Sequence, residues 1–358
     1  MSHRPSMQRP VMDPLFLQDV PPEADSPARQ RRQRWVRGAA RGLRWTARAL
    51  LSSPLARRSA TPAADGADPS TARPAGRASR AVRAVGYRLV FAPALVALVA
   101  STLVFSGTHP PAAAAAAESA PSDVYHDPVA FPAEDGVWLG GWIVPVVDAR
   151  RVMLHKDRLL RQRHPAVVLV HDFGRSPTQV LPLVGPLHDD GIVVLSVGLR
   201  GTGTPAPAAQ TFGLNEALDV RAAVDLLRGH PFVDPTRIAV VGLGTGANAA
   251  SLAAGRDAGI VAVVLADPVT DADAVVAARL GPDQFGLRWL QPAAKWAFEI
   301  GFQQHLDDAS PDQHVAALAG RKVLRLTAAT SADGLPTAAT VGKVRAFCRD
   351  TLRPWEGK

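Results

Sequence analysis

The residues best placed to do chemistry lie in and around a glycine-rich turn. Gly-Leu-Gly-Thr-Gly spans residues 242–246, directly after an apolar run and before an alanine-rich stretch. Turns of this kind cradle phosphates in nucleotide-binding proteins, but a P-loop also needs a lysine, and this turn has none. A dinucleotide-binding domain would carry an acidic residue at the end of its second strand, and none is evident here. We therefore expect no nucleotide cofactor.

Cysteine chemistry is excluded by the composition. Cys348 is the only cysteine of the chain, so neither an internal disulfide nor a cysteine cluster around a metal ion can form. The chain has ten histidines, and the last of them along the sequence is His314. The sequence contains no motif with the ligand spacing of a metal site, so no metal is expected.

The elements that must position the glycine-rich turn alternate between strand-like and helix-like patterns. Apolar runs typical of buried parallel strands occur at 166–170, 192–197, 238–242, 261–266 and 323–327. Helical patterns separate these runs, and an early antiparallel pair is expected around the turn Asp135-Gly136. This repetition predicts an α/β fold with a mostly parallel sheet covered by helices on both faces.

Six segments resemble, in the right order, successive landmarks of the α/β-hydrolase fold. They are VVLVHDFG (167–174), GLRGTG (198–203), EALDVRAAVDLLR (216–228), DPTRIAVVGLGTGANAA (234–250), VVLADP (263–268) and DDASPDQHVAAL (307–318). Residues 128 to about 353 are similar to the esterase, acyl-hydrolase and serine-peptidase-like branches of this family. The resemblance implies hydrolysis of ester or peptide bonds, and a helical cap inserted at about 271–306.

The resemblance places the family's nucleophile elbow, G-x-S-x-G, on the glycine-rich turn. Gly242 and Gly246 match the two flanking glycines. The nucleophile position is Gly244, which has no side chain to attack a carbonyl carbon. Thr245 is the only alternative nucleophile beside it, although its side chain would leave the elbow in another direction. The elbow is therefore expected to keep its shape and to lack its nucleophile.

The family's other catalytic groups are also incomplete. The general base is a histidine after the last strand, and no histidine follows His314 in this sequence. Asp333 falls roughly where the family has its acid, and it is either a remnant of that acid or a turn-forming residue before Gly334. Loss of either the nucleophile or the base removes most of a triad's rate.

The oxyanion side of the site is better preserved. His171-Asp172-Phe173-Gly174 resembles the family's H-G-x-G loop, which donates a backbone N–H to the developing oxyanion. Asp172 replaces the first glycine of that loop and would narrow the site. His171 either bridges loops or is the one base available to Thr245.

A separate apolar segment precedes the α/β domain. Residues 89–105 carry no charge, and residues 87–107 are expected to form one transmembrane helix. Arginines precede this segment, and no lysine or arginine follows it until Arg150. That asymmetry predicts a single-pass cell-membrane protein with a cytoplasmic N-terminus and an extracytoplasmic C-terminal domain. The alternatives are a cleaved signal peptide, which normally occupies the first ~15–30 residues, and a buried core helix.

The net charge of +8 is concentrated in the N-terminal tail. Residues 1–88 hold 17 arginines and no lysine. Because residues 1–86 are also rich in proline, alanine and serine, we expect a disordered cytoplasmic tail. Its arginines would contact anionic lipid head groups or would only orient the helix. Nucleic acid is not an expected partner, since no recognition motif is present. Residues 108–127, rich in alanine and proline, would link the helix to a domain at 128–358.

Two functions from different classes follow from the sequence. The first is a membrane-anchored pseudo-hydrolase that uses the α/β-hydrolase domain as a binding or scaffold module, with a small-molecule or peptide ligand that the sequence does not name. The second is an active hydrolase that uses Thr245 as a non-standard nucleophile and His171 as its base. The two are distinguished by whether these two side chains meet in one pocket.

Overall fold

The computed structural model describes residues 75–109, 124–146, 163–202, 208–279 and 288–352. Most of the predicted basic tail and most of the predicted linker lie outside these ranges.

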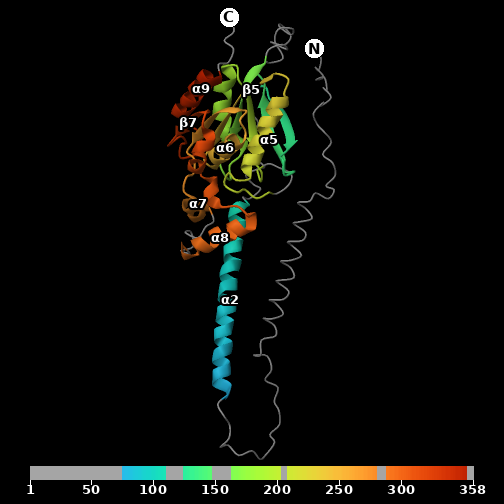
Figure 1. The fold of residues 1–358 in the computed structure, drawn as a ribbon. Helices are drawn as coiled ribbons and strands as arrows, with labels where there is room; N and C mark the ends of the chain where they lie inside the picture. The colour runs from blue at the N-terminus through green and yellow to red at the C-terminus, as the bar shows by residue number, and fades with distance from the viewer. Residues whose placement is uncertain (1–74, 110–123, 147–162, 203–207, 280–287, 353–358) are drawn as a thin grey trace, which may run out of the picture. The chain divides into compact units, whose positions relative to one another are not determined.

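The first described element is α2 (Ala75–Thr108), a helix of 34 residues with Pro93 inside it. Among the described residues, α2 is the one helix that is long and apolar enough to cross a membrane. Its candidate span is Gly86–Thr108, with a mean hydropathy of 2.3. Only 11% of its most apolar window is buried, whereas the core helix of a soluble protein is mostly buried. Three residues near its C-terminal end are buried: Ala100, Val104 and Thr108. The helix is drawn in blue to teal in Figure 1.

The strands of the described residues form one seven-stranded sheet in the order β1-β2-β4-β3-β5-β6-β7. The strands are β1 (Asp127–Pro132), β2 (Trp138–Val144), β3 (His164–Val170), β4 (Val193–Gly198), β5 (Val233–Leu243), β6 (Ile260–Ala266) and β7 (Lys322–Leu326). The pairs β1–β2 and β2–β4 are antiparallel, and all other neighbours are parallel. The predicted early hairpin is present, and Gly136 in its turn has φ +82°, a conformation that favours glycine.

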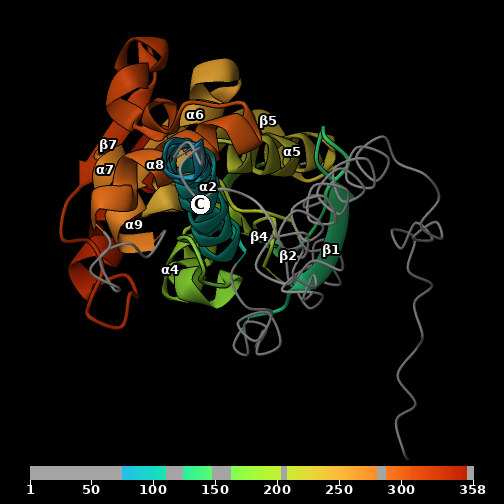
Figure 2. The same ribbon diagram turned by 90° about the horizontal axis from the view of Figure 1, so that it is seen from below.

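Helices cover both faces of the sheet because its central strands are apolar on both sides. The helices α5 (Glu216–Gly229) and α6 (Thr245–Arg256) lie together over one face, and α4 (Leu181–Asp189) lies on the other (Figure 2). The last helix, α9 (Ala338–Leu352), packs beside α4. A short 3-10 helix, η4 (Pro177–Val180), precedes α4.

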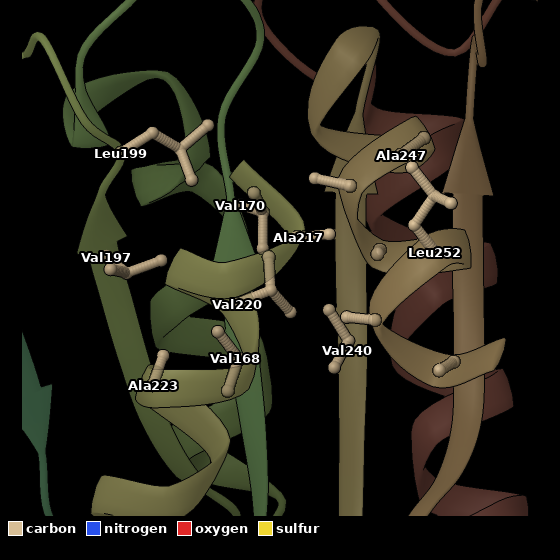
Figure 3. Close-up of a cluster of buried hydrophobic side chains, with 14 of the residues drawn as sticks. Val168, Val170, Val197, Leu199, Ala217, Val220, Ala223, Val240, Ala247 and Leu252 are labelled. Atoms are coloured by element: carbon tan, nitrogen blue, oxygen red, sulfur yellow. The ribbon is translucent and has the colours of Figure 1, made fainter. Parts of the chain in front are cut away.

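The hydrophobic core divides according to the alternation of the strands. In β3, Val168 and Val170 join the core under α5 and α6, whereas Val167 and Leu169 join the core under α4 and α9. Figure 3 shows side chains of α5 packed against those of β3 and β4, with α6 side chains beside β5. Fully apolar strands of this kind are required when both faces of a parallel sheet are covered.

A run of helices lies between β6 and β7, where the insert at about 271–306 was predicted. It consists of α7 (Ala272–Arg279), η5 (Arg288–Leu290), α8 (Gln291–Phe302), η6 (Leu306–Ala309) and η7 (Pro311–Leu318). The predicted fold class is confirmed: a mostly parallel sheet carries helices on both faces. The carboxyl ends of β3, β4 and β5 lie side by side, and the loops that follow them form the candidate site.

Candidate functional site

The turn between β5 and α6 has the backbone of a sharp strand-to-helix elbow. Gly244 joins the two elements with φ +56° and ψ −123°, which only glycine adopts without strain. The flanking glycines are required by close packing, since a Cβ atom at Gly242 would collide with the Gly246 backbone. A Cβ atom at Gly246 would lie 2.9 Å from the Val170 carbonyl oxygen. The two flanking glycines are therefore required by close packing, and Gly244 relieves the backbone strain of the middle position.

The carboxylate of Asp172 occupies the space above Gly244. A Cβ atom on Gly244 would overlap the Asp172 carboxylate and would lie 2.7 Å from its Oδ2 atom. The Phe173 N–H donates to Asp172 Oδ1 at 2.7 Å, and the Thr245 N–H donates to the same oxygen at 2.8 Å. The Thr245 hydroxyl donates to it as well, at 3.1 Å. One carboxylate oxygen thus collects two backbone donors and a hydroxyl at the place where an elbow side chain would begin.

Two glutamine side chains brace the loop that carries Asp172. The Asp172 N–H donates to Gln179 Oε1 at 2.7 Å, and Gln179 Nε2 donates to the Gly334 carbonyl oxygen at 2.7 Å. The Gly174 N–H donates to Gln210 Oε1 at 3.0 Å. Both glutamines are buried, and each satisfies partly buried backbone groups of the loops around it. These contacts hold the loop in one conformation.

His171 is fully buried and both of its ring nitrogens are engaged. Its Nδ1 lies 2.8 Å from the Asp172 carbonyl oxygen, which can only accept, so Nδ1 carries the proton. Its Nε2 accepts from the Leu199 N–H at 3.1 Å, and the Thr202 hydroxyl lies 3.2 Å away. Burial lowers the pKa of His171 from 6.5 to about 4. A ring whose lone pair accepts from a backbone N–H, and whose other nitrogen donates, bridges loops and is not placed as a general base.

Sequence comparison identifies the family. The model of the alpha/beta hydrolase family matches residues 167–357, which is more than half of the chain. The chain belongs to the alpha/beta hydrolase family. No curated protein matches it.

Several solved structures resemble this alpha/beta hydrolase in fold. The Pyrococcus furiosus esterase Pf2001 is 19% identical, with a TM-score of 0.46 over 66% of this chain and 97% of the esterase. The alpha/beta hydrolase GrgF from Penicillium sp. sh18 is 14% identical, with a TM-score of 0.45 over 64% and 100%. The hypothetical protein PA2218 from Pseudomonas aeruginosa is 16% identical, with a TM-score of 0.45 over 64% and 95%. All three fall below 25% identity and a TM-score of 0.5, so the family assignment depends on the family model.

In an alpha/beta hydrolase, the oxyanion hole consists of the N–H after the nucleophile and an N–H from the loop after β3. The predicted counterparts of those donors are the N–H groups of Thr245 and Phe173. Both donate to Asp172 Oδ1, a side-chain oxygen of the loop after β3. Thr245 Oγ1 also accepts from the Phe173 N–H at 2.9 Å, which ties this hydroxyl into the same network.

The predicted remnant acid lies in an exposed turn. Asp333 is exposed in a turn closed by the Gly334 N–H, which donates to the Ser331 carbonyl oxygen at 2.8 Å. Gly334 has φ +78°, and the turn is flanked by a bridge between Thr330 and Pro336. Asp333 thus has the position of a turn-forming residue.

The two histidines between β6 and β7 lie among exposed contacts. The side chain of His305 is 78% exposed and lies 3.6 Å from Glu299. The Nε2 atom of His314 contacts the Asp308 carbonyl oxygen at 2.7 Å. Neither contact belongs to the elbow turn or to the loop that carries Asp172.

Arg200, in the loop after β4, is buried in ion pairs that join neighbouring elements. It is 3% exposed, and its guanidinium donates to Asp219 at 2.6 Å and to Asp135 at 2.7 Å. Its backbone N–H also donates to Asp219 Oδ2 at 2.9 Å. The three residues join the loop after β4, helix α5 and the β1–β2 turn. Burial raises the pKa of Asp219 to about 6, against the opposing effect of the Arg200 charge.

An aromatic stack connects the oxyanion loop to the insert between β6 and β7. The ring of Phe173 stacks on Phe212 with centroids 4.9 Å apart, and Phe212 lies 5.8 Å from Phe298 of α8. Phe212 has φ +59°, unusual for a large side chain, so this packing stabilises a strained backbone. These ring contacts link the loop that carries Asp172 to α8.

Several residues of the site were not singled out from the sequence. Gln179 and Gln210 have no sequence signal, because a glutamine in a loop reads as an ordinary polar residue. Asp219 has a weak one, since it is an acidic residue beside the apolar stripe of α5. Asp267, after β6, was also not singled out from the sequence. Its carboxylate accepts from the N–H groups of Ala329 and Thr330 and joins the ends of β6 and β7.

Proposed function

We propose that this protein is a membrane-anchored alpha/beta hydrolase that binds a ligand or partner without hydrolysing it. The observation that carries this proposal is the position of the Asp172 carboxylate. It lies where the side chain of an elbow nucleophile would begin, and its Oδ1 accepts from both oxyanion donors.

Hydrolysis would require a substrate carbonyl oxygen to displace this carboxylate. Hydrogen bonds to an ionised acceptor are roughly twice as strong as those between neutral groups. A neutral carbonyl is therefore a poor competitor for the two N–H groups of Phe173 and Thr245. Gly244 supplies no nucleophile in any case. Two independent requirements of acyl transfer are thus unmet within one turn.

The membrane part of the proposal rests on α2. We propose that residues 87–107 cross the cell membrane once, with the arginine-rich tail (1–86) in the cytoplasm. The domain at 128–358 would then lie outside the cytoplasmic membrane, held by the linker 108–127. The apolar span Gly86–Thr108 and the arginines ahead of it support this topology. A phosphatase that is active only outside the cytoplasm should be active in cells when it is fused after residue 358. An inactive fusion would contradict the proposed orientation.

The catalytic part is tested with the purified full-length chain. The wild type should not hydrolyse short-chain nitrophenyl esters above the buffer rate, and a fluorophosphonate probe should not label it. Gly244→Ser should be equally unreactive, because the Asp172 carboxylate that the new Cβ atom displaces stays beside the elbow, where its negative charge repels the developing oxyanion. The double variant Asp172→Gly/Gly244→Ser should react with the probe about 10²-fold faster than Gly244→Ser, since it regains oxyanion donors.

The result that would overturn the proposal is turnover by the wild type that Thr245→Ala abolishes. Asp333→Ala is the matched control, because it changes an exposed acid in a turn and should leave any genuine activity intact.

A second candidate is an active hydrolase with Thr245 as nucleophile. The observation that favours it is the 3.1 Å contact from Thr245 Oγ1 to Asp172 Oδ1, which would make the carboxylate the base. Against it, the same carboxylate oxygen holds both oxyanion donors, and His171 is directed to Leu199. The Thr245→Ala comparison decides between the two candidates.

A further inference from the structure

The helical segment formed by η5 and α8 exposes three large apolar side chains. Trp289 is 66% exposed, Trp296 is 61% exposed and Ile300 is 57% exposed. Their spacings of seven and four residues are close to whole turns of a helix, so they share one side of it. We define the outer face of α8 as Trp289, Pro292, Trp296, Ile300 and Gln303.

The outer face is not the face that packs α8 onto the domain. Ala294 and Phe298, which are fully buried, lie on the opposite side of the helix. Phe298 contacts Phe212 and lies 4.7 Å from Phe302 between ring centroids. The helix therefore has its own core face and a second apolar face that remains exposed in the part of the chain that the structure describes.

Charged residues of α8 are confined to its flanks. Lys295 pairs with Asp307 at 3.0 Å and with Asp273 at 3.4 Å. Glu299 lies 3.6 Å from His305. The outer face itself contains only apolar residues and one glutamine, so it offers nothing to an acidic or a basic partner.

We propose that the outer face of α8 lies on the outer surface of the membrane in which α2 is anchored. Tryptophan is enriched at the membrane–water interface, where its ring sits at the level of the head groups. An interfacial helix binds through its buried apolar area, with its other face turned toward the protein. The inference depends on the membrane anchor in the proposed function, and it is independent of whether the domain is catalytic.

The length of chain between anchor and domain supports this occupant. The segment from Thr108, where α2 ends, to residue 124, where the described domain begins, can span at most roughly 55 Å. A tether this short keeps the domain beside the bilayer, so a weak apolar surface is enough to hold it there.

A second copy of the chain fits the outer face less well. Its three large side chains expose roughly 300–400 Å², whereas a stable dimer buries about 800 Å² on each partner. Docking on a bilayer needs no such minimum area, because the anchor already holds the domain beside the membrane.

The test uses the full-length chain in phosphatidylcholine vesicles, labelled with a polarity-sensitive fluorophore at one cysteine. Trp296→Cys reports on the outer face, with Ile300→Cys as a second reporter. Ala339→Cys, exposed on α9, is the matched control. The native Cys348 is buried, and unsubstituted protein gives its background. The fluorophore at 296 should emit at shorter wavelength, and iodide should quench it about threefold less than at 339.

The controls separate failure of this inference from failure of the anchor. Equal quenching at 296, 300 and 339, in chains that still float with the vesicles after an alkaline wash, would refute docking by α8 and leave the anchor intact. Chains that do not float would refute the anchor and docking together. Protection that disappears on tenfold dilution of protein in lipid would assign the face to a second copy. Protection lost at about 0.5 M salt would indicate electrostatic contact, which this uncharged face does not predict.

Discussion

Adding one methyl group to the elbow tests where the Asp172 carboxylate lies. Gly244→Ala places a side chain at φ +56°, which costs about 1–3 kcal/mol in backbone strain. The new Cβ atom also overlaps the Asp172 carboxylate and must expel it from its two backbone donors. Each of the two hydrogen bonds to a charged group contributes about 1.5–3 kcal/mol, so the total cost with the backbone strain is about 4–9 kcal/mol.

The same substitution should be much cheaper when the carboxylate is absent. In an Asp172→Gly background only the strain remains, about 1–3 kcal/mol. The two substitutions should therefore be coupled by about 3–6 kcal/mol, the contribution of the two hydrogen bonds. Thermal unfolding of the wild type, both single variants and the double variant measures this coupling. At about 2–4 °C per kcal/mol for a domain of this size, Gly244→Ala alone should lower Tm by about 8–36 °C.

A matched glycine separates strain from collision. Gly136 also has a positive φ, +82°, but a Cβ atom there would meet nothing within 4 Å. Gly136→Ala should therefore cost about 1 kcal/mol, and Asp172→Gly should leave that cost unchanged. If the Gly244 and Asp172 substitutions were additive within about 0.5 kcal/mol, the carboxylate would not occupy the nucleophile's place, and the proposed inactivity would lose its basis.

Three further outcomes follow from buried groups. Because the folded pKa of His171 is depressed from 6.5 to about 4, the unfolded chain binds the extra proton between these values. The contribution of neutral His171 is thus complete above pH 6.5 and falls by about 3 kcal/mol as pH drops to 4, and His171→Gln should flatten a plot of Tm against pH over this range. Burial raises the pKa of Cys348 to about 12, so iodoacetamide should not modify the native protein, and mass spectrometry should detect adducts only after unfolding. Arg200→Met should destabilise the domain by about 3–5 kcal/mol, because Asp219 is left buried and unpaired, and Arg200→Met/Asp219→Leu should recover much of that loss in chemical denaturation.

The strands and helices could be predicted because each has a strong local pattern. Valine-rich runs such as 166–170 are apolar at every position, which is the requirement of a strand buried on both faces. The elbow could be located because Gly242 and Gly246 are required by the close approach of α6 to the ends of β5 and β3. Both signals reside within a few consecutive residues.

The state of the site could not be predicted, because it depends on contacts between distant residues. Asp172 reads as a glycine replacement in the sequence, and its effect follows from a side-chain direction that brings it to Thr245, 73 residues away. The exposure of Trp296 is a similar case. Its apolar character is evident from the sequence, but only the packed orientation of α8 shows that this ring is turned away from the core.

The hydrogen bonds around Asp172 resemble those of a hydrolase that has not released its product. Ester and peptide hydrolysis both yield a carboxylic acid, and here a carboxylate is held by the Phe173 and Thr245 N–H groups. This carboxylate is part of the chain, so dilution does not remove it, and its effective concentration exceeds that of any free acid. Under the proposed function, a ligand of this domain would be recognised by surfaces other than the N–H groups of Phe173 and Thr245, and compounds built around a carbonyl or phosphonate group would be the wrong place to begin a search for it.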